Sequence, residues 1–118
     1  MPHMLLIHEP VGQRAARTEA EGRAAYDSML RWGAELRDRG ILIAAESLAA
    51  LDGAARVTAA GGKARIVDGP FAEVKEMVGG FFLLDVATRE EAIALAAECP
   101  AAAWATVEVR ALAPCYRD

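Results

Sequence analysis

The chain has 118 residues, of which 54% are hydrophobic and 25% charged, and its formal net charge is −4. These values suit one globular domain over residues 1–118 and exclude a disordered or fibrous chain. Lysine and arginine are not clustered, so neither nucleic acid nor a membrane surface is an expected partner. No apolar run approaches the ~20 residues of a membrane-spanning helix, and the N-terminus lacks a basic region followed by a long apolar stretch, so we expect a cytoplasmic protein. The two cysteines, Cys99 and Cys115, lack the spacing of a disulfide scaffold, so we expect reduced thiols.

The first half of the chain predicts a strand, a helix and a second strand. The helix begins at a T-x-x-E capping box, in which Thr18 and Glu21 satisfy free backbone donors. It ends at Gly40, a residue typical of the position after a helix. The expected bounds are Met4–His8 for the strand, Pro10–Arg17 for a loop, Thr18–Arg39 for the helix and Ile41–Leu48 for the second strand.

A hairpin is expected next, centred on Gly61 and Gly62, which supply the positive φ angles of a tight turn. Its strands are Arg56–Ala60 and Lys63–Val67, so Val57 should lie opposite Ile66 and Thr58 opposite Arg65.

The second half then repeats the pattern of the first. Phe81–Val86 predicts a strand, and Thr88 with Glu91 forms a second T-x-x-E box at the start of a helix. Pro100 marks the end of this helix. Thr106–Ala111 alternates with period two and predicts the last strand.

This order predicts an α+β fold, a ferredoxin-like sheet with two helices on one face and a hairpin insertion. The strands at Leu5–Ile7 and Phe81–Leu84 are apolar on both faces, although the helices cover only one. Since most soluble oligomers are symmetric, a second copy of the chain is the simplest cover for the other face. We therefore expect a homodimer.

The segment Asp68–Met77 is the most informative part of the sequence, with Gly79, Gly80 and the apolar run Phe81–Leu84 directly after it. Gly69 and Pro70 predict a turn, in which Gly69 should adopt a φ that β-branched residues tolerate poorly. The segment closely resembles the signature of DGPF-domain proteins within the YCII-related family, and the resemblance covers nearly the whole chain. It implies a small bacterial protein that forms a dimeric α+β barrel.

The resemblance has one gap. Some YCII-like proteins carry a His and an Asp at the first helix, thought to act as an acid/base pair. Asp38 matches the acidic position, but Met29 stands where the His would be expected. A His/Asp mechanism is therefore not transferred to this chain.

The charges of the signature segment are the best candidate site. Glu73 and Glu76 flank Lys75, and paired carboxylates beside a lysine can tune an acid or a base. The alternative is a solvated surface. Asp68 is either a further acid/base candidate or a residue that accepts backbone donors at the turn.

Polar residues on the first and last strands complete the set of candidates. His8 is either a catalyst or a hydrogen-bonded structural residue. Glu108 and Arg110 share one face of the last strand, where Arg110 could hold an anionic ligand or simply form an exposed ion pair. The catalytic candidates are thus His8, Asp68, Glu73 and Glu76, and the ligand-binding candidates are Phe71, Lys75, Phe81, Glu108 and Arg110.

No sequence motif predicts a metal or a nucleotide cofactor, because there is no His-x-x-x-His, no Cys and His cluster and no phosphate-binding loop. Two hypotheses remain. One is a binding protein or acid/base enzyme for a small polar or anionic metabolite, in a cavity at the dimer interface. The other is an accessory module, since the resemblance implies a link to extracytoplasmic-function sigma factors.

Overall fold

Strands and helices follow one another almost in the expected order in a computed structural model that describes residues 1–116. The strands are β1 (His3–Pro10), β2 (Leu42–Ser47), β3 (Ala55–Thr58), β4 (Arg65–Asp68), β5 (Glu76–Leu84) and β6 (Thr106–Ala111). The α-helices are α1 (Gln13–Ala16), α2 (Glu19–Asp38) and α3 (Arg89–Glu98), and short 3-10 helices lie at Leu51–Gly53, Ala60–Gly62 and Pro100–Ala103.

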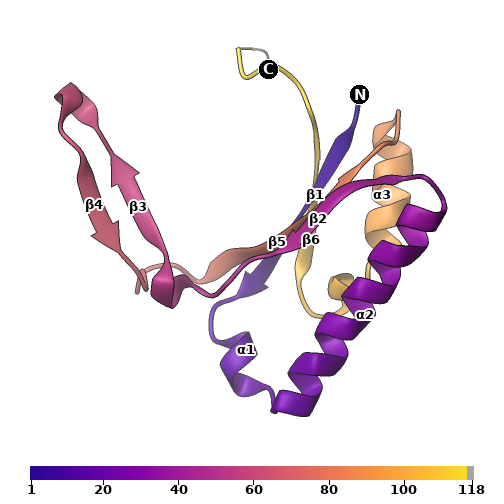
Figure 1. Ribbon diagram of the computed structural model, residues 1–118, viewed down its shortest axis with the longest axis horizontal. Coiled ribbons are helices and arrows are strands. Elements are labelled where there is room, and N and C mark those ends of the chain that lie inside the picture. Colours follow the sequence, from indigo (N-terminus) through magenta and orange to yellow (C-terminus); the bar gives the residue numbers. More distant parts are fainter. Residues whose placement is uncertain (117–118) are drawn as a thin grey trace.

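The main sheet is antiparallel, with the strand order β2-β5-β1-β6. Helices α2 and α3 lie on one face of this sheet, and the other face carries no helix (Figure 1). The predicted α+β class is therefore confirmed. Strands β3 and β4 form a separate two-stranded ribbon that extends away from the sheet (Figure 1).

The core lies between the sheet and the two helices. Residues of β1 alternate between buried and half-buried, so that Leu5 and Ile7 face the helices. Leu5, Leu36 and Leu84 are completely buried, and each such side chain stabilises the fold by roughly 1.5–3 kcal/mol. Core residues from both helices contact the strands, among them Trp32, Leu36, Ala92 and Leu95.

Both long helices begin at the predicted threonines. At α2, the Thr18 hydroxyl accepts the Glu21 N–H at 3.1 Å, and the Glu21 carboxylate accepts the Thr18 N–H at 2.8 Å. Gly40 follows α2 with a φ of 73°, as a left-handed C-terminal residue. At α3, only half of the box is present. The Thr88 hydroxyl accepts the Glu91 N–H, as in a capping box, but the Glu91 carboxylate accepts from the Thr88 hydroxyl instead of the Thr88 N–H.

Some element bounds differ from the prediction. The expected loop before α2 contains α1, and β5 begins five residues earlier than expected, at Glu76. Pairing explains the longer strand, because β1 continues to Pro10 and Pro10 lies opposite Glu76. In the ribbon, Val57 lies opposite Ile66 and Thr58 opposite Arg65, but the tip is a 3-10 turn in which Gly61 and Gly62 have positive φ.

The side chains of the main sheet that do not point toward the helices lie on the helix-free face. Met4, Leu6 and His8 project from β1, and Phe81 lies opposite Leu6 in β5. Within residues 1–116, no helix has both the length and the apolar composition needed to cross a membrane.

Candidate functional site

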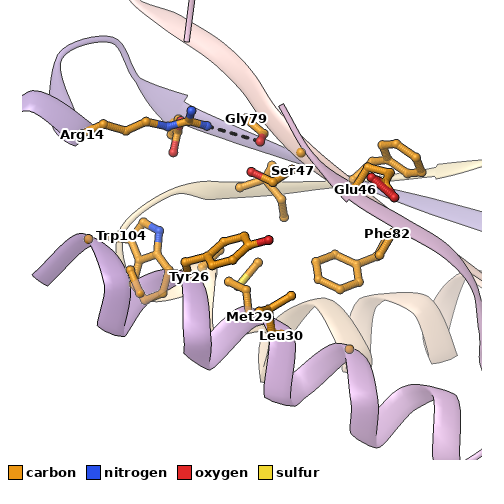
Figure 2. A pocket seen from close by; sticks show the side chains of 18 of the residues that line it. Arg14, Tyr26, Met29, Leu30, Glu46, Ser47, Gly79, Phe82 and Trp104 are labelled. Carbon is orange, nitrogen blue, oxygen red and sulfur yellow. Dashed lines mark hydrogen bonds and ion pairs between the residues drawn. The ribbon is translucent and has the colours of Figure 1, made fainter. Parts of the chain in front are cut away.

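A cleft of about 490 Å³ separates α2 from the sheet. Its apolar walls come from Met29 and Leu30 of α2 and from Ile7 and Phe82 of the sheet. Figure 2 shows Phe82 directed toward α2, with Met29, Leu30 and Tyr26 along the helix facing it. The cleft is large enough for a small organic molecule, and clefts of this volume and lining are typical of ligand sites.

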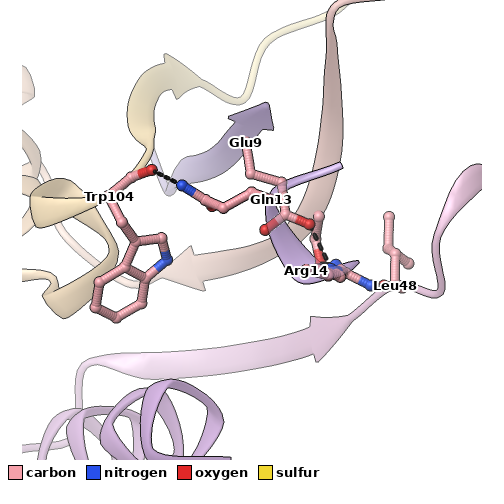
Figure 3. A network of polar contacts seen from close by, with 6 residues as sticks. Glu9, Gln13, Arg14, Leu48 and Trp104 are labelled. Carbon is pink, nitrogen blue, oxygen red and sulfur yellow. Dashed lines mark hydrogen bonds and ion pairs between the residues drawn. The ribbon is translucent and has the colours of Figure 1, made fainter. Parts of the chain in front are cut away.

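One end of the cleft is built around a buried ion pair. The carboxylate of Glu9 lies 2.6 Å from Nε of Arg14, and the Glu9 side chain is only 7% exposed. Arg14 also donates to two backbone carbonyls, those of Leu48 at 2.8 Å and Gly79 at 3.3 Å. Figure 3 shows this network beside Gln13 and Trp104. Arg14 therefore joins β1 to the residue that follows β2 and to the interior of β5.

The glycines after the signature segment make room for this network. A Cβ atom on Gly79 would lie 2.7 Å from the Glu9 carboxylate and 3.0 Å from an Arg14 nitrogen. A Cβ atom on Gly80 would lie 2.7 Å from the carbonyl oxygen of Glu46 in β2. Side chains at these two positions would push apart the strands that hold the cleft.

A second buried acceptor lies near the ion pair. Glu9 Oε1 is buried, and its partner is Nε of Arg14 at 2.6 Å. The amide of Gln13 donates to the Trp104 carbonyl at 2.8 Å, while its own Oε1 is buried without a donor from residues 1–116. Gln13 is not among the residues that line the cleft, so this acceptor is not part of the cleft wall.

Cationic groups outnumber carboxylates along the cleft. Its lining includes the guanidinium groups of Arg14, Arg17 and Arg37 and the carboxylates of Glu9 and Glu46. Arg17 lies over the Trp104 ring, 5.4 Å from its centroid, and no carboxylate of residues 1–116 forms an ion pair with it. A guanidinium without an ion-pair partner at a cleft is available for an anionic group.

Two of the sequence-predicted residues meet on the helix-free face. His8 Nε2 lies 2.6 Å from the Glu108 carboxylate, across the β1–β6 pair. Arg110 lies opposite Met4 on the same face, and it borders a hollow of about 560 Å³ that also includes Leu6 and Leu112. Phe81 lies opposite Leu6 in β5, and it is also among the residues that line the cleft.

The signature segment lies elsewhere, at the base of the ribbon. Phe71 is buried and the Arg56 guanidinium stacks over its ring at 3.9 Å, while Glu73 lies 3.6 Å from the same guanidinium. Asp68 ends β4 as an exposed residue, opposite Ala55. The Lys75 carbonyl accepts the Val11 N–H at 2.9 Å, and Glu76 begins β5.

A glycine is required at position 69 for a different reason from the one predicted. Its φ is not positive, so the expected special backbone angle is wrong. A Cβ atom there would instead lie 2.1 Å from the Leu51 carbonyl oxygen. Close approach of two backbone segments is what requires a glycine.

The candidate residues thus form two groups, one at the ribbon base and one on the helix-free face, and none of their charged side chains lines the cleft. The residues that do line its polar end, Glu9, Arg14 and Arg17, were missed. The sequence did contain a sign of Glu9. It follows Leu5 and Ile7 at every second position of β1, on the face that is buried, and a carboxylate is unusual at a buried position.

Met29, which stands where some YCII-like proteins carry a histidine, does line the cleft. The Cys99 thiol donates a weak hydrogen bond to the Met29 sulfur, with 4.0 Å between the two sulfur atoms. Burial raises the pKa of the Cys99 thiol. Asp38 is exposed at the end of α2 and lies outside the cleft lining. The cleft therefore has no His/Asp pair among its lining residues.

Among residues 1–116, no three His, Cys, Asp or Glu side chains gather closely enough to hold a metal ion. No curated protein matches the chain. The family model of the YCII-related domain matches residues 1–115. Because this match covers nearly the whole chain, the protein belongs to the YCII-related domain family.

Proposed function

We propose that the protein binds a small organic anion with an apolar body in the cleft between α2 and the sheet. The observation that carries the proposal is the combination of apolar walls with the guanidinium of Arg17, which forms no ion pair within residues 1–116. The walls favour burial of an apolar body, and the excess of arginine favours an anionic head. Such a ligand matches the small anionic metabolite expected from the sequence.

We also propose that two copies pair through the helix-free face to form a dimeric α+β barrel of ferredoxin-like sheets. Half-buried apolar side chains of β1 and β5, including Met4, Leu6 and Phe81, support this arrangement. In the dimer, the His8 and Glu108 pair would lie between the sheets, where Arg110 could meet a second ligand. A cavity at the dimer interface therefore stays a prediction beside the cleft.

Binding in the cleft can be tested with phenylpropanoate, a carboxylate with a phenyl body, by isothermal titration calorimetry. Replacement of Ala25 by Phe fills the cleft, because Ala25 lines it. We expect Ala25→Phe to weaken binding by about tenfold or more, since the ligand and the new ring compete for one space. The matched control is Ala24→Phe, an exposed neighbour on α2 outside the cleft lining, and its affinity should equal that of the wild type.

Equal loss in both variants, or no measurable binding of phenylpropanoate to the wild type at millimolar concentration, would contradict the proposal. The accessory hypothesis, a regulatory link to sigma factors, would then become the stronger one. Specific capture of a purified extracytoplasmic-function sigma factor by the protein would support it.

A further inference from the structure

We infer that the ribbon formed by β3 and β4 is an arm that packs on a second copy of the chain. The surface assigned to this contact is the ribbon face that carries Val57 and Ile66. The inference rests on the proposed dimer and goes beyond it, because it adds a contact made by residues outside the main sheet. It does not depend on the ligand proposed for the cleft.

The first support is the exposure of the ribbon. Every residue of β3 and β4 is exposed. Val57 lies opposite Ile66, so both side chains project from one face of the ribbon, and they are 62% and 64% exposed. A two-stranded hairpin by itself is at best marginally stable in water and needs a surface against which an apolar face can pack. Residues 1–116 of the same chain leave this face uncovered.

The base of the ribbon is held by contacts with the start of the signature segment. The Gly69 N–H donates to the Ala54 carbonyl at 2.7 Å. The Arg56 guanidinium lies 3.9 Å from the centroid of the Phe71 ring, and Phe71 is buried. Because these contacts lie where the ribbon joins the rest of the chain, they set the direction in which it projects.

The second support is that direction. The ribbon rises on the side of the main sheet that faces away from α2 and α3, toward the upper left of Figure 1. It makes the single chain extended, with a radius of gyration of 16.1 Å. A compact domain of the same length would have a radius of gyration of about 13.5 Å. A second copy on the helix-free face therefore lies on the same side as the ribbon, and two-fold symmetry produces the contact twice.

The third support is charge. Residues 55–68, which form the two strands and the turn between them, carry three lysine or arginine residues and one aspartate. The rest of the chain carries ten lysine or arginine residues and sixteen aspartate or glutamate residues. Within residues 1–116, neither Lys63 nor Arg65 forms an ion pair. A second copy thus offers the arm a surface of opposite net charge, which favours this partner.

Isotope-filtered NMR of the wild-type protein tests the contact directly. In a mixture of labelled and unlabelled copies, the filtered spectrum reports only proton contacts between two copies. We expect such contacts from the methyl groups of Val57 and Ile66 as well as from those of Leu6. Contacts from Leu6 without any from Val57 or Ile66 would overturn the arm and leave the proposed dimer standing. A protein that is monomeric at NMR concentration would contradict both.

Two neighbouring substitutions measure how much the apolar face contributes. Val57→Asp places a carboxylate beside Ile66, and Thr58→Asp places the same charge on the other face of the same strand. Both positions are exposed in the single chain, so both variants should fold. Val57→Asp should raise the dissociation constant of the dimer by about tenfold or more, because the carboxylate loses its hydration against the partner.

Thr58→Asp is the matched control, and its dissociation constant should stay within about threefold of the wild-type value. A dilution series followed by analytical ultracentrifugation gives all three constants. An unchanged constant for Val57→Asp would overturn the arm. An equal rise in both variants would show that only the charge of the ribbon matters, which would overturn the assignment to the face with Val57 and Ile66.

Discussion

Gly69 lies where the start of the signature segment passes the 3-10 helix that precedes β3. Its N–H donates to the Ala54 carbonyl at 2.7 Å, and a Cβ atom would lie 2.1 Å from the Leu51 oxygen. We expect Gly69→Ala to reduce the free energy of unfolding by about 1–3 kcal/mol, because backbone atoms must move apart. Denaturant unfolding provides the measurement. Gly53→Ala is the control, since a Cβ atom there meets nothing within 4 Å, and its effect should be within about 0.5 kcal/mol of zero.

Glu73 is a surface partner of Arg56. Its side chain is 75% exposed and the closest approach of the two charged groups is 3.6 Å. Solvent screens such a pair, so Glu73→Gln should change the melting temperature very little. The same variant should keep its affinity for phenylpropanoate, because Glu73 does not line the cleft. Lost binding at an unchanged melting temperature would instead place the site in the signature segment.

At the scale of elements, the start of α2 depends on the Thr18 and Glu21 box. Removing the hydroxyl in Thr18→Ala should cost about 1 kcal/mol of stability, because the Glu21 N–H loses its acceptor. Thr18→Ser retains the hydroxyl and should recover most of this loss. Thermal unfolding followed by circular dichroism gives both values. Equal stability of Thr18→Ala and the wild type would show that the box contributes nothing.

The same box makes a pH-dependent contribution. Hydrogen bonds from the Thr18 backbone and side chain lower the pKa of Glu21 from its ordinary value of 4.5. A lowered folded-state pKa means that the stabilisation is complete above about pH 4.5 and is lost as the pH falls through the folded-state value. The difference between wild type and Thr18→Ala should therefore shrink in acid. A difference that stays constant down to the acid transition would contradict the role of the Glu21 carboxylate.

At the scale of the whole molecule, the apolar helix-free face predicts that two copies of the chain form a dimer. Leu6 lies at the centre of that face, between Phe81 and Glu108 on the flanking strands. Stable pairing buries roughly 800 Å² on each partner, and a charge placed there would lose its hydration. We expect light scattering to give a dimer for the wild type and a monomer for Leu6→Glu.

The control for assembly is Ile93→Glu, a change of the same kind at an exposed position on α3, on the opposite side of the sheet. This variant should stay dimeric. A wild-type monomer at micromolar concentration that also fails to bind a hydrophobic dye would contradict the dimer.

The sequence alone determined the elements and most of their ends. Thr18, Gly40 and Thr88 act within one turn of the chain, and the alternation in Thr106–Ala111 reports on a single strand. The class of fold also follows from these local signals, because their order restricts how helices and strands can pack. The family was recognised from one contiguous segment and its surroundings, and it is confirmed.

Only the tertiary structure decided where chemistry can occur. Glu9, Arg14 and Gly79 belong to different elements. Their contacts depend on strand register, and no local pattern encodes that a Cβ atom at position 79 would lie 2.7 Å from the Glu9 carboxylate. The same applies to Phe71, whose partner Arg56 comes from β3, and to Gly69, whose φ is ordinary. The secondary structure follows from interactions between residues that are close in sequence. The cleft depends on packing and on ion pairs between residues that are distant in sequence.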